Sequence, residues 1–143
     1  MISSEKLREI RKLRGKTQKE VAIMSGLTPT AIRNYELSLR SPSDEQLEII
    51  AQALECNSSA LRSHDLKNNF DICQIIFDLE ERFEFRPIIE GGVPSLLGGN
   101  PEFIDFLIEW KEMKDKHFNE EITDEELRDW KLSYPLKSRH YKR

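Results

Sequence analysis

The residue types that most often bind metals or act as catalytic acids and bases are few and widely spaced in this chain of 143 residues. Its histidines are His64, His117 and His140, and none has the spacing of a metal motif such as HExxH. Cys56 and Cys73 form neither a disulfide framework nor a zinc quartet, so both are expected to be buried, reduced thiols. We therefore predict no catalytic residue, no metal site and no cofactor, and we do not expect an enzyme.

Acidic and glycine-rich stretches are the other candidates for chemistry. The acids of residues 120–126 lie around the start of an expected helix, where carboxylates offset the helix dipole. Gly91-Gly92 and Gly98-Gly99 are typical of turns, and the chain has neither a P-loop nor a Gly-x-Ser-x-Gly elbow. Neither stretch indicates a reaction.

The formal net charge of −4 hides a strong asymmetry along the chain. Residues 1–40 carry nine Lys and Arg against four Glu, whereas residues 69–135 carry 17 acidic and seven basic side chains. The last eight residues, 136–143, add four basic side chains as an expected solvated tail. Such a change of sign favours a nucleic-acid-binding head with a second module attached.

Composition places the chain among globular proteins, with 38% hydrophobic and 34% charged residues. No apolar run approaches the length of a membrane span, and the start MISSEKLREIRKLR has no apolar signal region. We therefore expect a cytoplasmic protein without a membrane partner.

Short helices are predicted throughout residues 1–63. Leu7, Ile10 and Leu13 recur at helical spacing before Gly15. Thr17 with Glu20 and Ser43 with Gln46 form capping boxes that begin two further helices. Between them, Thr28-Pro29 begins a helix over about 29–37 that turns Ala31, Ile32 and Tyr35 inward, and a short turn over 58–63 closes the segment.

Two of these helices are separated by a three-residue turn that contains Gly26. This spacing is typical of a helix-turn-helix unit, whose second helix enters the DNA major groove. Residues 7–54 closely resemble the Cro/CI (lambda-repressor-like, xenobiotic-response-element) helix-turn-helix family. The matching stretches are RKLRGKTQKEVA, SGLTPTAIRNYE and PSDEQLEIIAQAL. The resemblance implies an all-α, five-helix DNA-binding domain that usually acts as a dimer on a palindromic operator.

The same resemblance implies roles for individual residues. Gln18 and Thr28 match phosphate-contacting positions, and Lys16, Lys19 and Arg40 are candidates for attraction to phosphates. The positions that match base-reading residues are Pro29, Thr30, Arg33 and Asn34. Arg11 and Glu36 match a pair that joins the first helix to the third, and we assign them a structural role.

Two positions depart from the family pattern. Lys16 stands where the family usually has an apolar residue, which affects local packing. Leu37-Ser38 replaces the usual Asn-Gly after the recognition helix, which predicts a different path for this turn.

A linker over 64–69 is expected to lead into a small α+β module over 70–135. An amphipathic helix over about 69–83 precedes two short strands around Glu90-Gly91-Gly92. A helix from Pro101 and a last helix from Thr123 follow. Phe103, Phe106, Trp110 and Trp130 are expected to be core residues, with a dimer seam or a ligand pocket as the alternative. The module is similar to C-terminal regions of Gram-positive bacterial regulators.

These features together predict a sequence-specific transcriptional regulator of bacterial or phage origin, associated with the nucleoid. We expect a repressor-type homodimer on double-stranded DNA, with a small-molecule or protein effector at the C-terminal module. The alternative is an antitoxin or a phage-type immunity factor whose C-terminal module binds a protein partner.

Overall fold

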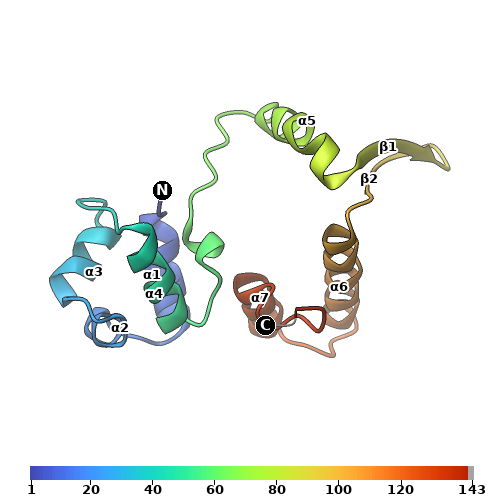
Figure 1. The fold of residues 1–143 in the computed structure, drawn as a ribbon. Coiled ribbons are helices and arrows are strands. Elements are labelled where there is room, and N and C mark those ends of the chain that lie inside the picture. Colours follow the sequence, from blue (N-terminus) through green and yellow to red (C-terminus); the bar gives the residue numbers. More distant parts are fainter. Residues whose placement is uncertain (142–143) are drawn as a thin grey trace. The chain divides into compact units, whose positions relative to one another are not determined.

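A computed structural model describes residues 1–141, and its chain divides into two compact units (Figure 1). The first unit joins Met1–His64 to the segment that begins at Glu125, and the second is Asp65–Asp124. No helix within residues 1–141 is long and apolar enough to cross a membrane.

Six helical elements make up the first unit. They are α1 (Ser4–Leu13), α2 (Gln18–Ser25), α3 (Pro29–Glu36), α4 (Asp44–Ala53), the 3-10 helix η1 (Ser58–Leu61) and α7 (Asp124–Ser133). Both predicted capping boxes are present. The Thr17 and Ser43 hydroxyls each accept a hydrogen bond from the backbone N–H of the residue three positions later. The backbone N–H groups of Thr17 and Ser43 in turn donate to the side chains of Glu20 and Gln46. The predicted all-α domain is confirmed.

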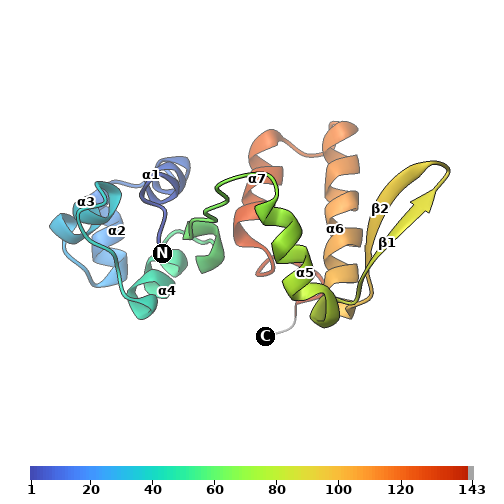
Figure 2. The ribbon, with the colours of Figure 1, turned by 90° about the horizontal axis from the view of Figure 1, so that it is seen from above.

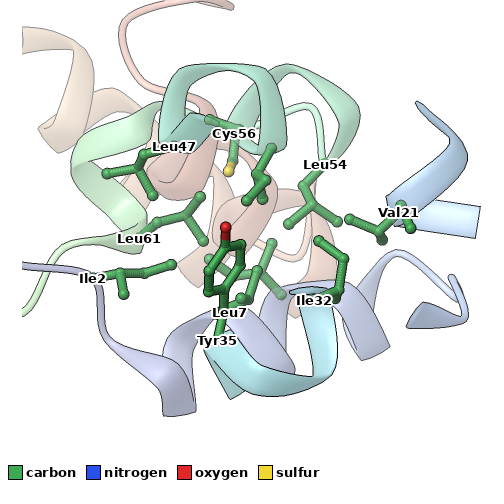
Figure 3. Packing of buried hydrophobic residues seen from close by; sticks show 13 residues of the cluster. Ile2, Leu7, Val21, Ile32, Tyr35, Leu47, Leu54, Cys56 and Leu61 are labelled. Atoms are coloured by element: carbon green, nitrogen blue, oxygen red, sulfur yellow. The ribbon is translucent and has the colours of Figure 1, made fainter. Parts of the chain in front are cut away.

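One hydrophobic cluster holds α1–α4 and η1 together (Figure 3). Leu7, Ile10, Ile32, Leu54 and Leu61 are fully buried within it. Each such side chain contributes about 1.5–3 kcal/mol relative to leaving it exposed. The cluster includes residues from every helix of the N-terminal segment, so the position of α3 depends on all of them.

Cysteine burial matches the prediction at only one of two positions. Cys56 is buried in the cluster, and this burial raises the pKa of its thiol to about 11, against the lowering effect of the Arg14 charge. Cys56 therefore stays a neutral thiol at physiological pH. Cys73 lies exposed on the second unit, so the expectation of two buried thiols is wrong for that residue.

The second unit ends earlier in the chain than the module that we expected. We expected one module over 70–135 and a solvated tail over 136–143, but α7 belongs to the unit that contains the N-terminal helices. Leu132 packs against their core, and its carbonyl accepts a hydrogen bond of 2.8 Å from the backbone N–H of Asn57. Lys137 in the expected tail pairs with Asp129 at 2.6 Å. Lys142 and Arg143 lie outside the described residues.

The second unit contains α5 (Asp71–Phe83), β1 (Phe85–Glu90), β2 (Val93–Gly98) and α6 (Pro101–Phe118). The strands form the predicted antiparallel hairpin, whose tip lies away from α5 in both views (Figures 1 and 2). Phe83, Phe85 and Phe103 pack against one another with ring centroids 5.3–5.8 Å apart at its base. Trp110, which we expected in a core, is 36% exposed.

Candidate nucleic-acid interface

The turn between α2 and α3 fixes the relative orientation of the two helices. Gly26 ends α2 in the left-handed region, with φ of 64°, and the N–H of Leu27 donates to the carbonyl of Ala22 at 2.9 Å. Thr28 begins α3 by accepting from the N–H of Ala31 at 3.1 Å. The predicted helix–turn–helix geometry is therefore held by a backbone hydrogen bond at one end of the three-residue turn and by the Thr28 side-chain cap at the other.

Helix α3 has one buried face and one exposed face. Ile32 and Tyr35 point into the core, and the Tyr35 hydroxyl donates to Oε1 of Gln46 at 3.2 Å. The predicted base-reading residues lie on the other side, where Pro29, Thr30 and Arg33 are exposed and Asn34 is half-buried. Among the described residues, the side chains of Arg33 and Asn34 make no hydrogen bond or ion pair. Their donors and acceptors are therefore available to a ligand.

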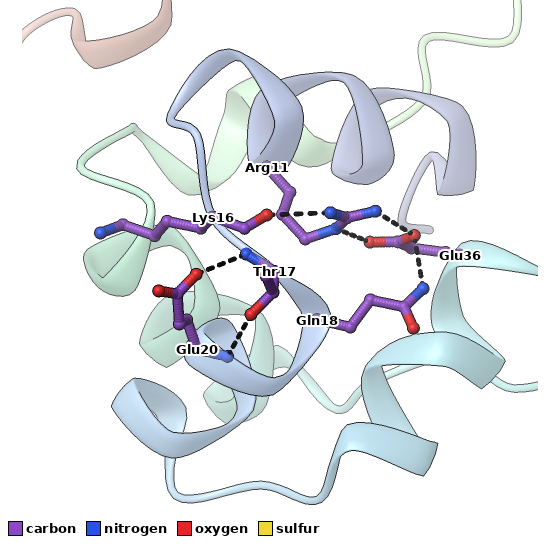
Figure 4. A network of polar contacts seen from close by, with 6 residues as sticks. All are labelled: Arg11, Lys16, Thr17, Gln18, Glu20 and Glu36. Carbon is purple, nitrogen blue, oxygen red and sulfur yellow. Dashed lines mark hydrogen bonds and ion pairs between the residues drawn. The ribbon is translucent and has the colours of Figure 1, made fainter.

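A polar network joins α1, α2 and α3 (Figure 4). The Arg11 guanidinium contacts both carboxylate oxygens of Glu36, at 2.5 and 3.0 Å, and donates to the backbone carbonyl of Lys16 at 2.9 Å. The Glu36 side chain is only 3% exposed and that of Arg11 12%. Arg11 and Glu36 thus form the bidentate pair expected of them, in a position largely removed from water.

Glu36 carries an altered pKa as a result. Burial by itself raises the pKa of this carboxyl, but hydrogen bonds from Arg11 and Gln18, with the charges of Arg11 and Arg8, outweigh burial and hold the pKa below its ordinary value. Glu36 is therefore ionised at neutral pH and stabilises the position of α3 in that form.

Two of the predicted phosphate-contacting residues, Gln18 and Thr28, are held in place by hydrogen bonds within the domain. The Gln18 amide donates one N–H to Oε2 of Glu36 at 2.9 Å, which leaves its second N–H available. Thr28 uses its oxygen to cap α3, so its hydroxyl proton remains free to donate. Lys19 and Arg40 are exposed, and Lys16 is half-buried.

The turn after α3 adopts a left-handed conformation at Ser38, with φ of 58°. The N–H groups of Leu39 and Arg40 both donate to the carbonyl of Asn34, at 2.9 and 3.4 Å, and the Ser38 hydroxyl donates to that of Ser4 at 2.8 Å. A serine thus occupies the backbone conformation that glycine most readily adopts. The altered dipeptide still gives a tight turn, which places Arg40 next to the end of α3.

Some of the basic side chains of the first unit are already paired and are not available to bind a polyanion. Arg14 donates to the carbonyls of Leu54 and Glu55, at 2.8 and 3.0 Å, and pairs with Asp129 at 2.5 Å. Arg128 pairs in turn with Glu9. The structural role of Arg14 could not be read from local spacing, because its partners lie about 40 and 115 positions away in the sequence. Arg11 and Arg14 are thus largely covered and paired, so the positive field of the domain comes from its exposed basic side chains.

Acidification should destabilise the first unit through two carboxyls. Burial raises the pKa of Asp129, but hydrogen bonds from Lys137 and Arg14 and their charges outweigh it, so its pKa, like that of Glu36, is lowered. A carboxyl with a lowered folded-state pKa contributes stability above its unfolded pKa and loses it as pH falls through the folded value. The ordinary pKa values are 4.5 for Glu36 and 3.8 for Asp129.

We therefore expect the free energy of unfolding to stay level above about pH 5.5 and to fall steadily below it. Urea denaturation at a series of pH values measures this fall. The Glu36→Gln and Asp129→Asn variants should each show a shallower fall than the parent chain. Equal slopes in the parent and both variants would show that other groups cause the acid sensitivity.

No group of three or more His, Cys, Asp or Glu within residues 1–141 is arranged to hold a metal ion. His117 instead pairs with Asp124 at 2.5 Å, at the C-terminal end of α6.

Comparison with known proteins gives a family match, and similar solved structures that include the two described here. Residues 7–61 match the helix-turn-helix family model. No curated protein matches the chain. The restriction-modification controller protein C.AhdI from Aeromonas hydrophila is 29% identical, with a TM-score of 0.41, over 41% of this chain and 89% of that one. The P22 c2 repressor protein, solved in complex with synthetic operator 9T in the presence of Tl⁺, is 29% identical, with a TM-score of 0.42, over 46% of this chain and 98% of that one.

Proposed function

Since residues 7–61 form a helix-turn-helix domain of the Cro/CI type, we propose that the chain is a sequence-specific DNA-binding transcriptional regulator. In this proposal the chain acts as a repressor and binds a palindromic operator as a homodimer. The observation that carries the proposal is the exposed face of α3. It presents Arg33 and Asn34, which have no partner within residues 1–141, while the opposite face of α3 is fixed in the core.

The chemistry of this face suits the edges of base pairs in the major groove. The Arg33 guanidinium can donate to guanine O6 and N7, and the Asn34 amide can pair with adenine N6 and N7. Each bidentate contact of this kind contributes about 1–3 kcal/mol of discrimination against the wrong base. Pro29 and Thr30 lie one turn earlier on the same exposed face, where the Thr30 methyl can contact thymine.

Contacts to phosphate would hold α3 in register on the duplex. The Thr28 hydroxyl lies at the start of α3, whose N-terminal amides favour an anion, and the Gln18 amide lies beside Glu36 at the other end of the helix. Lys16, Lys19 and Arg40 add positive charge that acts on any sequence.

A homodimer is proposed because a single α3 offers few base contacts. Two copies bound to half-sites about 34 Å apart double those contacts and make the second binding event intramolecular.

Selection of bound sequences from random duplex DNA, followed by fluorescence anisotropy of the selected site, tests this function. We expect a palindromic preference, and a logarithmic affinity that falls with the logarithm of salt by about 0.9 for each phosphate neutralised. Lys19→Ala should reduce that slope by about 1 per subunit. The matched control is Lys114→Ala in α6, which should leave the slope unchanged. Absence of any sequence preference at low salt would refute the proposal.

A further inference from the structure

The second unit is inserted into the chain of the first. The first unit consists of Met1–His64 and the segment that begins at Glu125, so residues 65–124 are connected to it at both ends. The connection over residues 64–69 contains no helix or strand, whereas the other connection leads directly into α7. A change within the second unit therefore reaches the DNA-binding helices most directly through α7.

Ion pairs join α7 to α1. Nη1 of Arg14 lies 2.5 Å from Oδ1 of Asp129, whose other oxygen lies 2.6 Å from Nζ of Lys137. Arg128 pairs with Glu9, and both of these side chains are about half exposed. Dissolved ions can reach such pairs and screen them. The attachment of α7 should consequently weaken as salt concentration rises.

The apolar part of this attachment is small. Among residues 125–141, Leu132 alone packs against the hydrophobic cluster of the N-terminal helices, and it is only half-buried. The buried Trp130 contacts Tyr134 of its own segment, with ring centroids 5.2 Å apart. Hydrophobic stabilisation is roughly proportional to the apolar area removed from water. Release of α7 should therefore cost much less free energy than unfolding of the cluster itself.

Arg14 connects α7 to two helices of the DNA-binding domain. It is the C-cap residue of α1, and its guanidinium donates to the carbonyls of Leu54 and Glu55 at the end of α4, at 2.8 and 3.0 Å. The Arg14 side chain is only 14% exposed, so it depends on Asp129 for a carboxylate. Asp129 thus holds the residue that ties α1 to α4.

The start of α7 is tied to the end of α6. Oδ1 of Asp124 lies 2.5 Å from Nε2 of His117, and the N–H of Glu121 donates to the carbonyl of Lys116 at 2.8 Å. Only five residues, 119–123, separate the two helices. A displacement of the end of α6 would be passed on to α7, because these hydrogen bonds leave little slack in the turn.

We propose that α7 is a releasable helix of the DNA-binding domain and that its docking strengthens binding to the operator. The inference rests on the proposed function and adds its regulation. With α7 docked, Arg14 joins α1 to α4, and α1 carries the Arg11–Glu36 pair that positions α3. A molecule that binds the second unit more tightly when α7 is released would lower the affinity for DNA.

Cys56 provides a reporter of the docked state. It is buried, and the N–H of the next residue, Asn57, donates to the carbonyl of Leu132 in α7. Cys56 also lines a cavity of about 710 Å³ together with Ser133 and Lys137. Release of α7 removes that wall of the cavity and should expose the thiol. In a Cys73→Ser chain, which keeps Cys56 as its one thiol, the rate of alkylation by iodoacetamide measures release.

We expect Asp129→Asn in this chain to raise the rate of Cys56 alkylation about tenfold or more, because the released fraction increases. The matched control is Glu125→Gln on the same helix, which also replaces a carboxylate by an amide. Glu125 is exposed and has no partner within residues 1–141, so the control should leave the rate unchanged. Without either change, added salt should increase the rate. Equal rates in the two variants would overturn the inference.

The urea dependence of the rate separates release of one helix from global unfolding. Release exposes little surface, so the logarithm of the rate should rise with urea much less steeply than the equilibrium constant for unfolding. Equal slopes would show that Cys56 reacts only through the unfolded chain, which would overturn the inference.

The operator tests the link to DNA binding. If docking strengthens DNA binding, saturating operator must favour docking by the same factor, and we expect it to slow alkylation about fivefold or more. A duplex without the operator, at a salt concentration that leaves it unbound, is the control. A chain that binds its operator but alkylates at the same rate in both states would overturn this inference alone. Failure to select any sequence would instead refute the proposed function.

Discussion

Replacing Glu36 by Ala should lower the free energy of unfolding of the first unit by about 3–5 kcal/mol, because it leaves the Arg11 guanidinium without its carboxylate in a largely buried site. Gln18 would lose its acceptor in the same change. Urea denaturation followed by circular dichroism measures the effect as a lower midpoint with little change in slope. Because Glu36 is the last residue of α3, affinity for DNA should fall together with stability.

An exposed ion pair of the same unit serves as the control. Arg62 and Asp44 are 3.1 Å apart, but the Asp44 side chain is 83% exposed, so Asp44→Ala should cost less than about 1 kcal/mol. A double-mutant cycle with Arg11→Ala separates the pair's own coupling from the cost of leaving one charge alone. Equal losses for Glu36→Ala and Asp44→Ala would contradict the structural role assigned to the buried pair.

Replacing Arg33 by Ala should weaken binding to the selected operator by about 1–3 kcal/mol and relax the base preference at one position of each half-site. Stability should change by no more than about 0.5 kcal/mol, because the Arg33 side chain is exposed and has no partner within residues 1–141. Anisotropy with the operator and with operators changed at single base pairs measures both effects.

Arg33→Lys distinguishes base reading from simple attraction to phosphate. Lysine keeps the positive charge but lacks the planar fork that matches guanine. We expect Arg33→Lys to retain affinity for random duplexes and to lose most of the discrimination. If the lysine variant keeps the full base preference, Arg33 is a phosphate contact and the base-reading assignment is wrong.

Much of the N-terminal domain was predictable because its signals are local. A capping box such as Thr17 with Glu20 involves groups only three residues apart, and the turn at Gly26 depends on the backbone freedom of one residue. The alternation of Ile32 and Tyr35 with Arg33 and Asn34 likewise follows from helical periodicity. These short-range rules are satisfied in any tertiary context that keeps the helices.

Local signals were thus enough to predict where the helices of the first 61 residues begin, which face of α3 is exposed and which residues that face offers. The association of α7 with the N-terminal helices could not be predicted in this way, because Arg14 and Asp129 are far apart in the chain and each has ordinary surface chemistry. The folded chain also leaves some apolar residues of α5 and the hairpin exposed, among them Phe77 and Ile89. Hydrophobic periodicity identifies a face that needs cover, but it contains no information about whether the same chain or a second molecule supplies that cover.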